Sequence, residues 1–235
     1  MREAITFPNV LAVLSLIVGL PSVLALFFDR QEIAAVLVLL LVAGVIGGVL
    51  FWRWHTKLPP VTVMSTEGTL TFEDKDARIA TQQVKMRVRA NHNGVQRFMV
   101  AEARGDGPVK DILIDDEHPT LEEVMDTKRV YKVFHPPLRY REEQDVEASF
   151  RWEDSFSDKT ESWRHSVAHK TKQLSMTIEF HPDRMCKGAK AMVSYASEPQ
   201  EPITEGFSRS PKGRKVELKV PNPKLGGEYV LEWDW

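Results

Sequence analysis

Residues 84–90, with the sequence VKMRVRA, indicate the fold of the larger part of this chain. Apolar side chains alternate strictly with basic ones. A β-strand therefore places its valines and methionine on one face and Lys85, Arg87 and Arg89 on the other. Such a strand fits a sheet with one face in a core and one face in water.

The same alternation recurs in 148–152, 174–180, 216–220 and 229–235. Shorter candidates occupy 69–72, 97–103, 111–114, 130–134 and 191–195. Segments rich in Gly, Pro and Asn separate these runs and predict turns. We therefore predict an all-β domain, a mostly antiparallel β-barrel or β-sandwich. The one helix predicted in this part is short, at 120–126, directly after Pro119.

The first 57 residues have a different character. Residues 33–52 contain no charged side chain, and a helix of this length matches the hydrocarbon layer of a bilayer, about 30 Å. A second apolar run at 9–28 is separated from it by only four residues. We expect a transmembrane helical hairpin over 1–57 and a β-rich domain over 58–235. A cleaved signal peptide and a buried core helix are the alternatives for the two runs.

Basic residues indicate the orientation of this hairpin. Arg53, His55 and Lys57 follow the second apolar run, whereas the connection at 29–32 holds one arginine and two acids. Because basic flanks stay inside, we expect both termini and the β-rich domain in the cytoplasm, with the chain a multi-pass protein of the cell membrane. A single cysteine, Cys186, fits a reducing compartment.

Charge and motifs limit the possible functions. Of the 31 basic and 33 acidic residues, residues 1–57 hold four and three, which leaves 58–235 slightly acidic. This balance argues against binding of long nucleic acid. The sequence has no phosphate-binding glycine loop, GxSxG or HExxH motif, so we expect neither catalysis nor a cofactor. The pair His165 and His169, and Cys186, are weak candidates for a metal ligand set and a nucleophile.

Basic and aromatic residues form the candidate ligand site. Guanidinium groups bind phosphate in a bidentate manner, and aromatic rings stack on bases. The residues that combine these chemistries are Arg87, Arg89, Tyr140, Arg151, Trp152 and Arg164. The alternative is a solvated sheet face whose arginines pair with cross-strand carboxylates such as Glu147 and Glu153.

In its organisation, the chain resembles a family of bacterial anti-phage effectors. Two N-terminal apolar runs, a short link and a strand-rich domain ending in EYVLEWDW, residues 228–235, resemble the SMODS-associated two-transmembrane, β-strand-rich effectors of CBASS signalling. The resemblance implies a β-barrel that binds a cyclic oligonucleotide, most simply a cyclic dinucleotide. It also implies ligand-induced homo-oligomerisation and disruption of the inner membrane by the hairpins.

Two other functions remain open from the sequence. One is a membrane-tethered, immunoglobulin-like adaptor whose edge strands or loops bind a protein partner. The other is an enzyme with an unrecognised site. The first predicts no nucleotide affinity, and the second predicts turnover that a single polar substitution abolishes.

Overall fold

The computed structural model describes residues 42–45, 47–48, 59–103, 109–124, 127–195 and 198–235. The chain divides into two compact units, Met1–Leu58 and Pro59–Trp235. In the first unit, residues 42–45 and 47–48 are helical. The rest of the two predicted membrane helices, 9–28 and 33–52, lies outside the described residues. Within the described part of the chain, no helix has the length and apolar character needed to cross a membrane.

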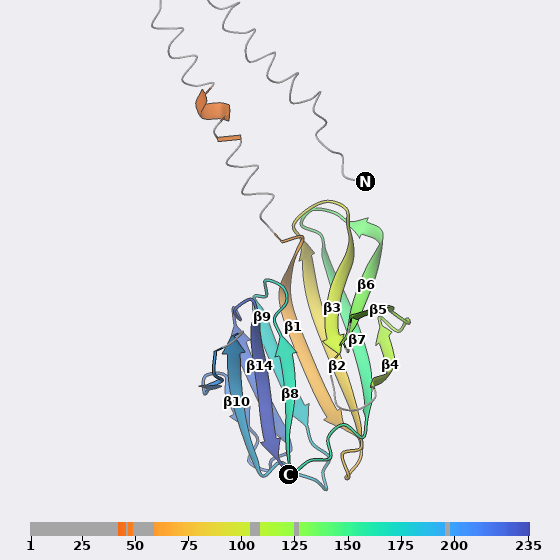
Figure 1. The fold of residues 1–235 in the computed structure, drawn as a ribbon, viewed down its shortest axis with the longest axis vertical. Helices are drawn as coiled ribbons and strands as arrows, with labels where there is room; N and C mark the ends of the chain where they lie inside the picture. The colour runs from red at the N-terminus through yellow and green to blue at the C-terminus, as the bar shows by residue number, and fades with distance from the viewer. Residues whose placement is uncertain (1–41, 46, 49–58, 104–108, 125–126, 196–197) are drawn as a thin grey trace, which may run out of the picture. The chain divides into compact units, whose positions relative to one another are not determined.

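The second unit consists of β-strands (Figure 1). Strands of the first half are β1 (Val61–Phe72), β2 (Ile79–Ala90), β3 (Val95–Ala103), β4 (Val109–Ile114), β5 (Thr120–Val124), β6 (Thr127–Leu138) and β7 (Glu143–Glu153). Strands of the second half are β8 (Thr160–Ser166), β9 (Gln173–Glu179), β10 (Gly188–Tyr195), β11 (Glu201–Ile203), β12 (Phe207–Arg209), β13 (Lys215–Pro221) and β14 (Gly227–Asp234). The prediction of an all-β domain is confirmed.

The strands form three sheets. A seven-stranded sheet has the order β12-β13-β9-β1-β2-β7-β4, a four-stranded sheet the order β11-β10-β14-β8, and a three-stranded sheet the order β3-β6-β5. Pairing is antiparallel except between β1 and β9, which run parallel from Thr66 opposite Leu174 to Thr71 opposite Glu179. Each sheet ends in edge strands, so among the described strands the sheets are open.

Alternation along β2 explains why the seven-stranded sheet has two different faces. Val84, Met86 and Val88 are buried, whereas Lys85 and Arg87 are exposed. The neighbouring strand β7 alternates in the same way, with Val146, Ala148 and Phe150 in the core. One face of the sheet is therefore apolar and covered, and the other is polar and open to solvent.

The core joins the seven-stranded sheet to the four-stranded one. Phe72 of β1 lies 5.8 Å from Trp233 of β14 and 5.0 Å from Trp235, measured between ring centroids. Nearer the middle of β1, Gly68 faces Trp163 of β8 so closely that an added Cβ would lie 2.8 Å from Cη2 of the ring. Glycine at this position lets the two sheets approach each other.

The prediction of a helix at 120–126 is wrong for residues 120–124, the part of this segment that the structure describes. Thr120–Val124 form the edge strand β5, in which Leu121 lies opposite Val130 and Glu122 opposite Arg129 of β6. A helix this short has too few internal hydrogen bonds to offset the cost of nucleation. Backbone hydrogen bonding to β6 therefore decides the conformation.

Candidate functional site

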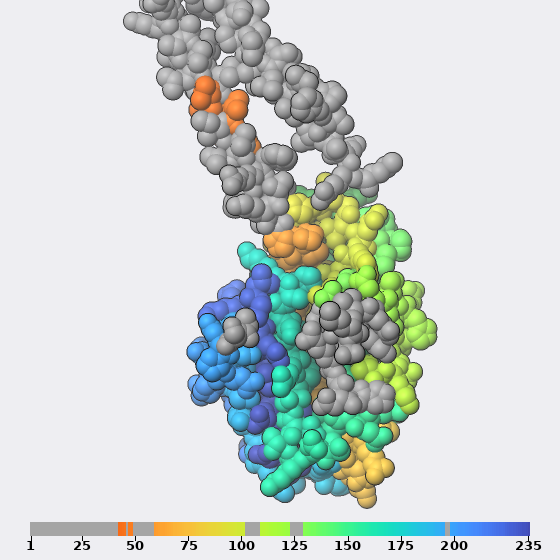
Figure 2. Space-filling model, viewed as in Figure 1, coloured from red at the N-terminus to blue at the C-terminus, as the bar shows by residue number. Residues whose placement is uncertain are grey.

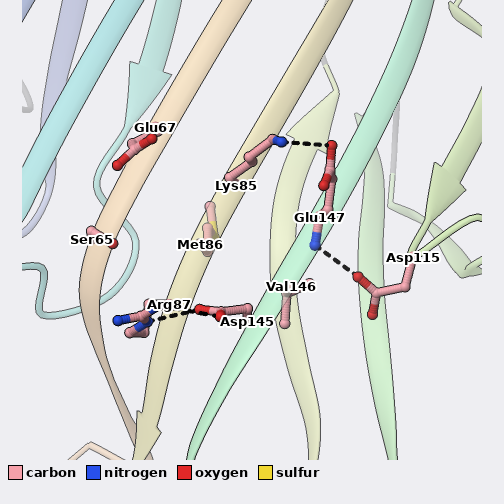
Figure 3. Close-up of a pocket in the computed structure, with 9 residues that line it drawn as sticks. All are labelled: Ser65, Glu67, Lys85, Met86, Arg87, Asp115, Asp145, Val146 and Glu147. Carbon is pink, nitrogen blue, oxygen red and sulfur yellow. Dashed lines mark hydrogen bonds and ion pairs between the residues drawn. The ribbon is translucent and has the colours of Figure 1, made fainter.

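An open trough lies on the polar face of the seven-stranded sheet (Figure 3). Its volume is 420 Å³, and strands β1, β2 and β7, with the loop after β4, supply its walls. The lining residues are Ser65, Glu67, Lys85, Met86, Arg87, Asp115, Asp145, Val146 and Glu147. The same alternation that buries the apolar side of β2 thus points its charged residues into the trough.

Cross-strand ion pairs cross the floor of this trough. Lys85 lies opposite Glu147 and Arg87 opposite Asp145 in the β2–β7 register. Arg87 Nε donates to Asp145 Oδ1 at 2.8 Å, and its Nη2 donates to Oδ2 at 3.3 Å. Lys85 Nζ lies 3.3 Å from Glu147 Oε1. Facing positions on adjacent strands are close enough for opposite charges to pair, and the register places these two pairs side by side.

The Arg87–Asp145 pair sets the charge states at this position. The hydrogen bond from Arg87 holds the pKa of the Asp145 carboxyl below its ordinary value, and the same bond raises the pKa of Arg87. The two side chains nevertheless remain 55% and 71% exposed. Exposed ion pairs are worth little because water solvates both partners well, so these groups can exchange partners.

Asp115 closes the other side of the trough. Its Oδ1 accepts a 2.8 Å hydrogen bond from the backbone N–H of Glu147, and its own N–H donates to the Glu147 carbonyl at 2.8 Å. Lys132 Nζ lies 2.7 Å from Asp115 Oδ2. With Glu67, the lining carries four carboxylates against the two cations of Lys85 and Arg87. The trough is therefore an acidic surface with mixed charges.

The predicted ligand residues on the seven-stranded sheet lie at different heights along it. Arg87 lines the trough. Arg89 is two residues farther along β2, opposite Thr62 and Glu143. Arg151 lies toward the other end of β7, 3.9 Å from carboxylate oxygens of both Glu73 and Glu153.

The remaining predicted residues lie elsewhere. Arg164 is on β8 of the four-stranded sheet and pairs with Glu228 at 3.1 Å. Trp152 is buried, and its Nε1 donates to Gln82 Oε1, so its ring belongs to the core and is closed to a stacking base. Tyr140 lies in the β6–β7 turn beside Arg141, which stacks over its ring. The structure thus does not gather the six residues into one site.

Of the trough's acidic residues, the sequence singled out Glu147 alone, as a possible cross-strand partner of the arginines, whereas Glu67, Asp115 and Asp145 were not predicted. Asp145 and Glu147 are spaced two residues apart, as are Lys85 and Arg87, and the antiparallel register superposes the two pairs. This complementarity between a K-x-R and a D-x-E stretch was visible in the sequence. Asp115 had no such signal, because it enters the site from the loop after β4.

The candidates for a metal ligand set and a nucleophile, His165, His169 and Cys186, occupy positions in which they serve the packing of the domain. His165 lies in β8 and His169 in the loop after it, so they share no helix face. Burial lowers the pKa of His165 to about 4 and lowers that of His169, whose Nε2 lies 3.0 Å from the Met99 carbonyl oxygen. Burial also raises the pKa of Cys186, whose Sγ donates to the Gly188 carbonyl. In the described part of the chain, no three His, Cys, Asp or Glu residues are grouped as metal ligands.

Comparisons with known proteins show only distant structural similarity. No family model matches the sequence, and no curated protein matches it. An M1 zinc metallopeptidase from Deinococcus radiodurans superposes with a TM-score of 0.39 and 11% identity, over 73% of this chain and 42% of that one. Yeast LTA4 hydrolase gives 0.37 and 10%, over 74% and 28%. A Legionella pneumophila structure described as a nutrient-binding protein gives 0.43 and 8%, over 74% and 67%. Similarity at this level says nothing about the activity of the present chain.

Proposed function

We propose that this chain is a membrane-anchored, non-catalytic adaptor whose β domain binds a segment of a partner protein in the trough of the seven-stranded sheet. The observation that carries this proposal is the charge of the lining, an open hollow in which four carboxylates face the cations of Lys85 and Arg87, with Lys132 paired to one of the four, Asp115. A partner segment bearing Lys or Arg complements this surface. The apolar runs at 9–28 and 33–52 supply the membrane anchor.

The exposed ion pairs favour such exchange of partners. Asp145 and Glu147 each already pair with a basic side chain of the same domain, Asp145 with Arg87 and Glu147 with Lys85. A basic side chain of the partner replaces or joins these pairs, and little desolvation opposes it because the groups stay in contact with water. Electrostatic complementarity of this kind supplies specificity and speeds association.

A second candidate is the sensor-effector: a β domain that binds a cyclic oligonucleotide, after which homo-oligomerised hairpins disrupt the inner membrane. The observation in its favour is the placement of Lys85 and Arg87 side by side on the face that lines the trough. A cyclic dinucleotide has two phosphates to meet these cations. It must also displace the bidentate Arg87–Asp145 pair and lie against four carboxylates, which makes this candidate the weaker of the two.

The two candidates are distinguished by ligand charge. The full chain in lipid nanodiscs is heated in the presence of one of three kinds of ligand. These are a peptide that contains lysine and arginine, an acidic peptide as the charge control, and cyclic di- and trinucleotides. A ligand present at about a hundredfold above its dissociation constant adds about 2.7 kcal/mol of stability, which a melting curve resolves. We expect a shift with the basic peptide alone.

Variants assign the shift to the trough. Asp145→Asn combined with Glu147→Gln removes two carboxylates without changing side-chain size, and we expect it to abolish the peptide shift. Glu232→Gln is the matched control, because Glu232 pairs with Lys190 at 2.6 Å on the four-stranded sheet, away from the trough. A shift with a cyclic nucleotide that Arg87→Ala abolishes would instead establish the sensor and overturn the adaptor.

A further inference from the structure

Pro59, the first residue of the β domain, lies at one end of that domain, where loops contact it and the start of β1. Asn91, in the β2–β3 turn, donates from Nδ2 to the Pro59 carbonyl at 2.8 Å. The Val63 N–H donates to the Lys170 carbonyl at 2.9 Å, which brings the β8–β9 loop to the same end. In Figures 1 and 2 the first residues of β1, in orange, and this loop, in teal, lie at the same end of the unit.

Other loops complete this end of the domain. The Arg141 N–H donates to the Ala90 carbonyl at 2.8 Å, and the Asn222 N–H donates to the Lys172 carbonyl at 2.7 Å. Tyr195, the last residue of β10, lies opposite Gly227 at the start of β14. We call the surface formed by the described loop residues 91–94, 139–142, 167–172, 198–200 and 222–226 the anchor-side rim.

The anchor-side rim is basic, although the β domain as a whole is slightly acidic. Its five basic residues, all exposed, are Arg139, Arg141, Lys170, Lys172 and Lys224. Its acidic residues are Glu142 and Glu198. The five basic residues lie on three loops, 139–142, 167–172 and 222–226, which are far apart in the sequence and which the fold brings to one end of the domain.

Exposed apolar and aromatic side chains accompany these charges. Leu225 is 67% exposed and Tyr140 is 46% exposed, and both lie in rim loops. The Gly226 N–H donates to the Val167 carbonyl at 2.9 Å, which fixes the turn that holds Leu225 outward. Nearby, Lys224 Nζ lies 4.6 Å from the centre of the Tyr195 ring. Basic residues combined with exposed leucine and tyrosine are typical of surfaces that contact the headgroup region of a bilayer.

The length of the chain connection sets an upper limit on the distance between Pro59 and the expected membrane anchor. Only six residues, 53–58, separate Trp52, the end of the second apolar run, from Pro59, so the seven Cα–Cα steps between them span at most about 25 Å when fully extended. We propose that the anchor-side rim binds the headgroups of anionic phospholipids at the membrane surface. This inference rests on the membrane anchoring in the proposed function.

Tethering makes a weak contact of this kind sufficient. A basic residue near an anionic lipid surface strengthens binding roughly fivefold, and the attraction extends over a Debye length of about 8 Å at physiological salt. The short link raises the effective concentration of the rim at the surface. In this proposal the rim binds the bilayer, and the trough on the polar face of the seven-stranded sheet stays open to a partner from the cytoplasm.

The test places a fluorescent reporter in the rim of the full chain. Cys186→Ser provides a cysteine-free background, and Ala168→Cys, at an exposed rim position, carries an environment-sensitive dye. Met185→Cys carries the same dye as a control, since Met185 is exposed in the loop between β9 and β10, at the opposite end of these strands. Each labelled chain is reconstituted into vesicles of phosphatidylcholine alone or of phosphatidylcholine with about 30% phosphatidylglycerol. The anionic lipid gives the second kind of vesicle a strong negative surface potential.

We expect a blue shift and quenching by headgroup spin labels at position 168 only in the anionic vesicles. Raising the salt to about 0.5 M should reverse both signals, because it shortens the Debye length. Lys170→Glu, Lys172→Glu and Lys224→Glu together should abolish them, and the corresponding three Gln substitutions should weaken them. Soluble inorganic phosphate at about 10 mM should leave them unchanged, because the occupant is a lipid surface with many charges.

Flotation of the vesicles distinguishes loss of rim docking from loss of membrane anchoring. A chain that floats with neutral and anionic vesicles, but whose dye at position 168 responds equally in both, is anchored without docking and overturns this inference alone. A chain that fails to float with either lipid overturns the anchor and hence the proposed function as well. Equal responses at positions 168 and 185 would mean that the whole domain collapses onto lipid, which also contradicts docking by the rim.

Discussion

Replacement of Gly68 by alanine tests how closely the two main sheets approach. The added Cβ would lie 2.8 Å from Cη2 and 3.1 Å from Cζ2 of Trp163, whereas carbon atoms in favourable contact are about 3.5–4.0 Å apart. β1 has β2 on one side and β9 on the other, so Gly68 cannot retreat within its sheet. The Trp163 ring must therefore move by several tenths of an ångström or more.

The expected loss follows from two opposing contributions. Overpacking of a core costs about 1–3 kcal/mol, and alanine returns about 0.4–1 kcal/mol by restricting the unfolded chain. We expect Gly68→Ala to lower the free energy of unfolding by about 1–2 kcal/mol. For a domain of this size that corresponds to a fall of about 3–6 °C in Tm. The assay is a melting curve of the full chain in detergent micelles, followed by tryptophan fluorescence.

A second variant tests whether contact with the Trp163 ring causes the loss of stability. Trp163→Phe removes the ring carbons that the new methyl group would contact, so Gly68→Ala in that background should cost less than about 0.5 kcal/mol. Thr69→Ala, on the opposite face of β1, serves as the control for a generic effect on the strand. An equal cost of Gly68→Ala with tryptophan or phenylalanine at position 163 would refute the proposed steric cause, as would a gain in stability with Trp163 present.

Three further outcomes are expected of the same protein. Because burial depresses the folded-state pKa of His165 and His169, their contribution to stability is complete above the unfolded value of about 6.5 and is lost as the pH falls from there toward 4. Tm measured between pH 7.5 and 4.5 should therefore drop, and His165→Asn should flatten the profile above pH 5. Leu218→Ala, at a fully buried position of β13, should cost about 2–5 kcal/mol in a denaturant titration. Cys186, buried and with a raised thiol pKa, should react with a thiol reagent only as fast as the domain opens, and reaction with the folded protein at the rate of free cysteine would contradict this.

Local alternation made the long strands predictable. β2, β7 and β13 bury alternate residues on a sheet with one wet face, and this alternation is present in the sequence itself. β9 and β14 follow the same pattern, except that Thr177 and Val230 are buried as well. β8 was not predicted because Trp163 is the one buried residue among its seven, so the polar residues around it conceal the strand. The segment Thr120–Val124 was misassigned because its conformation depends on β6, a partner that local pattern does not reveal.

The site was less predictable than the fold because it depends on register. Lys85 and Arg87 were correctly placed on the solvent face, but their partners come from β7, about 60 residues later in the chain. The parallel pairing of β1 with β9 was equally hidden, since alternation is the same in parallel and antiparallel strands. Trp152 was assigned to ligand stacking because its neighbour is an arginine, yet the period of two in β7 places it in the core.

The position of β14 within its sheet has a consequence for how the protein is made. β14 pairs with β10 on one side and β8 on the other, although it follows both of them in the chain and is therefore synthesised after them. Until it emerges from the ribosome, β8 lacks the strand that it pairs with, and β10 has only the short β11. The nascent domain thus exposes unpaired edges of β8 and β10 until β14 has emerged. Such edges attract other chains, so chaperones are expected to bind this domain until β14 is available to pair with β8 and β10.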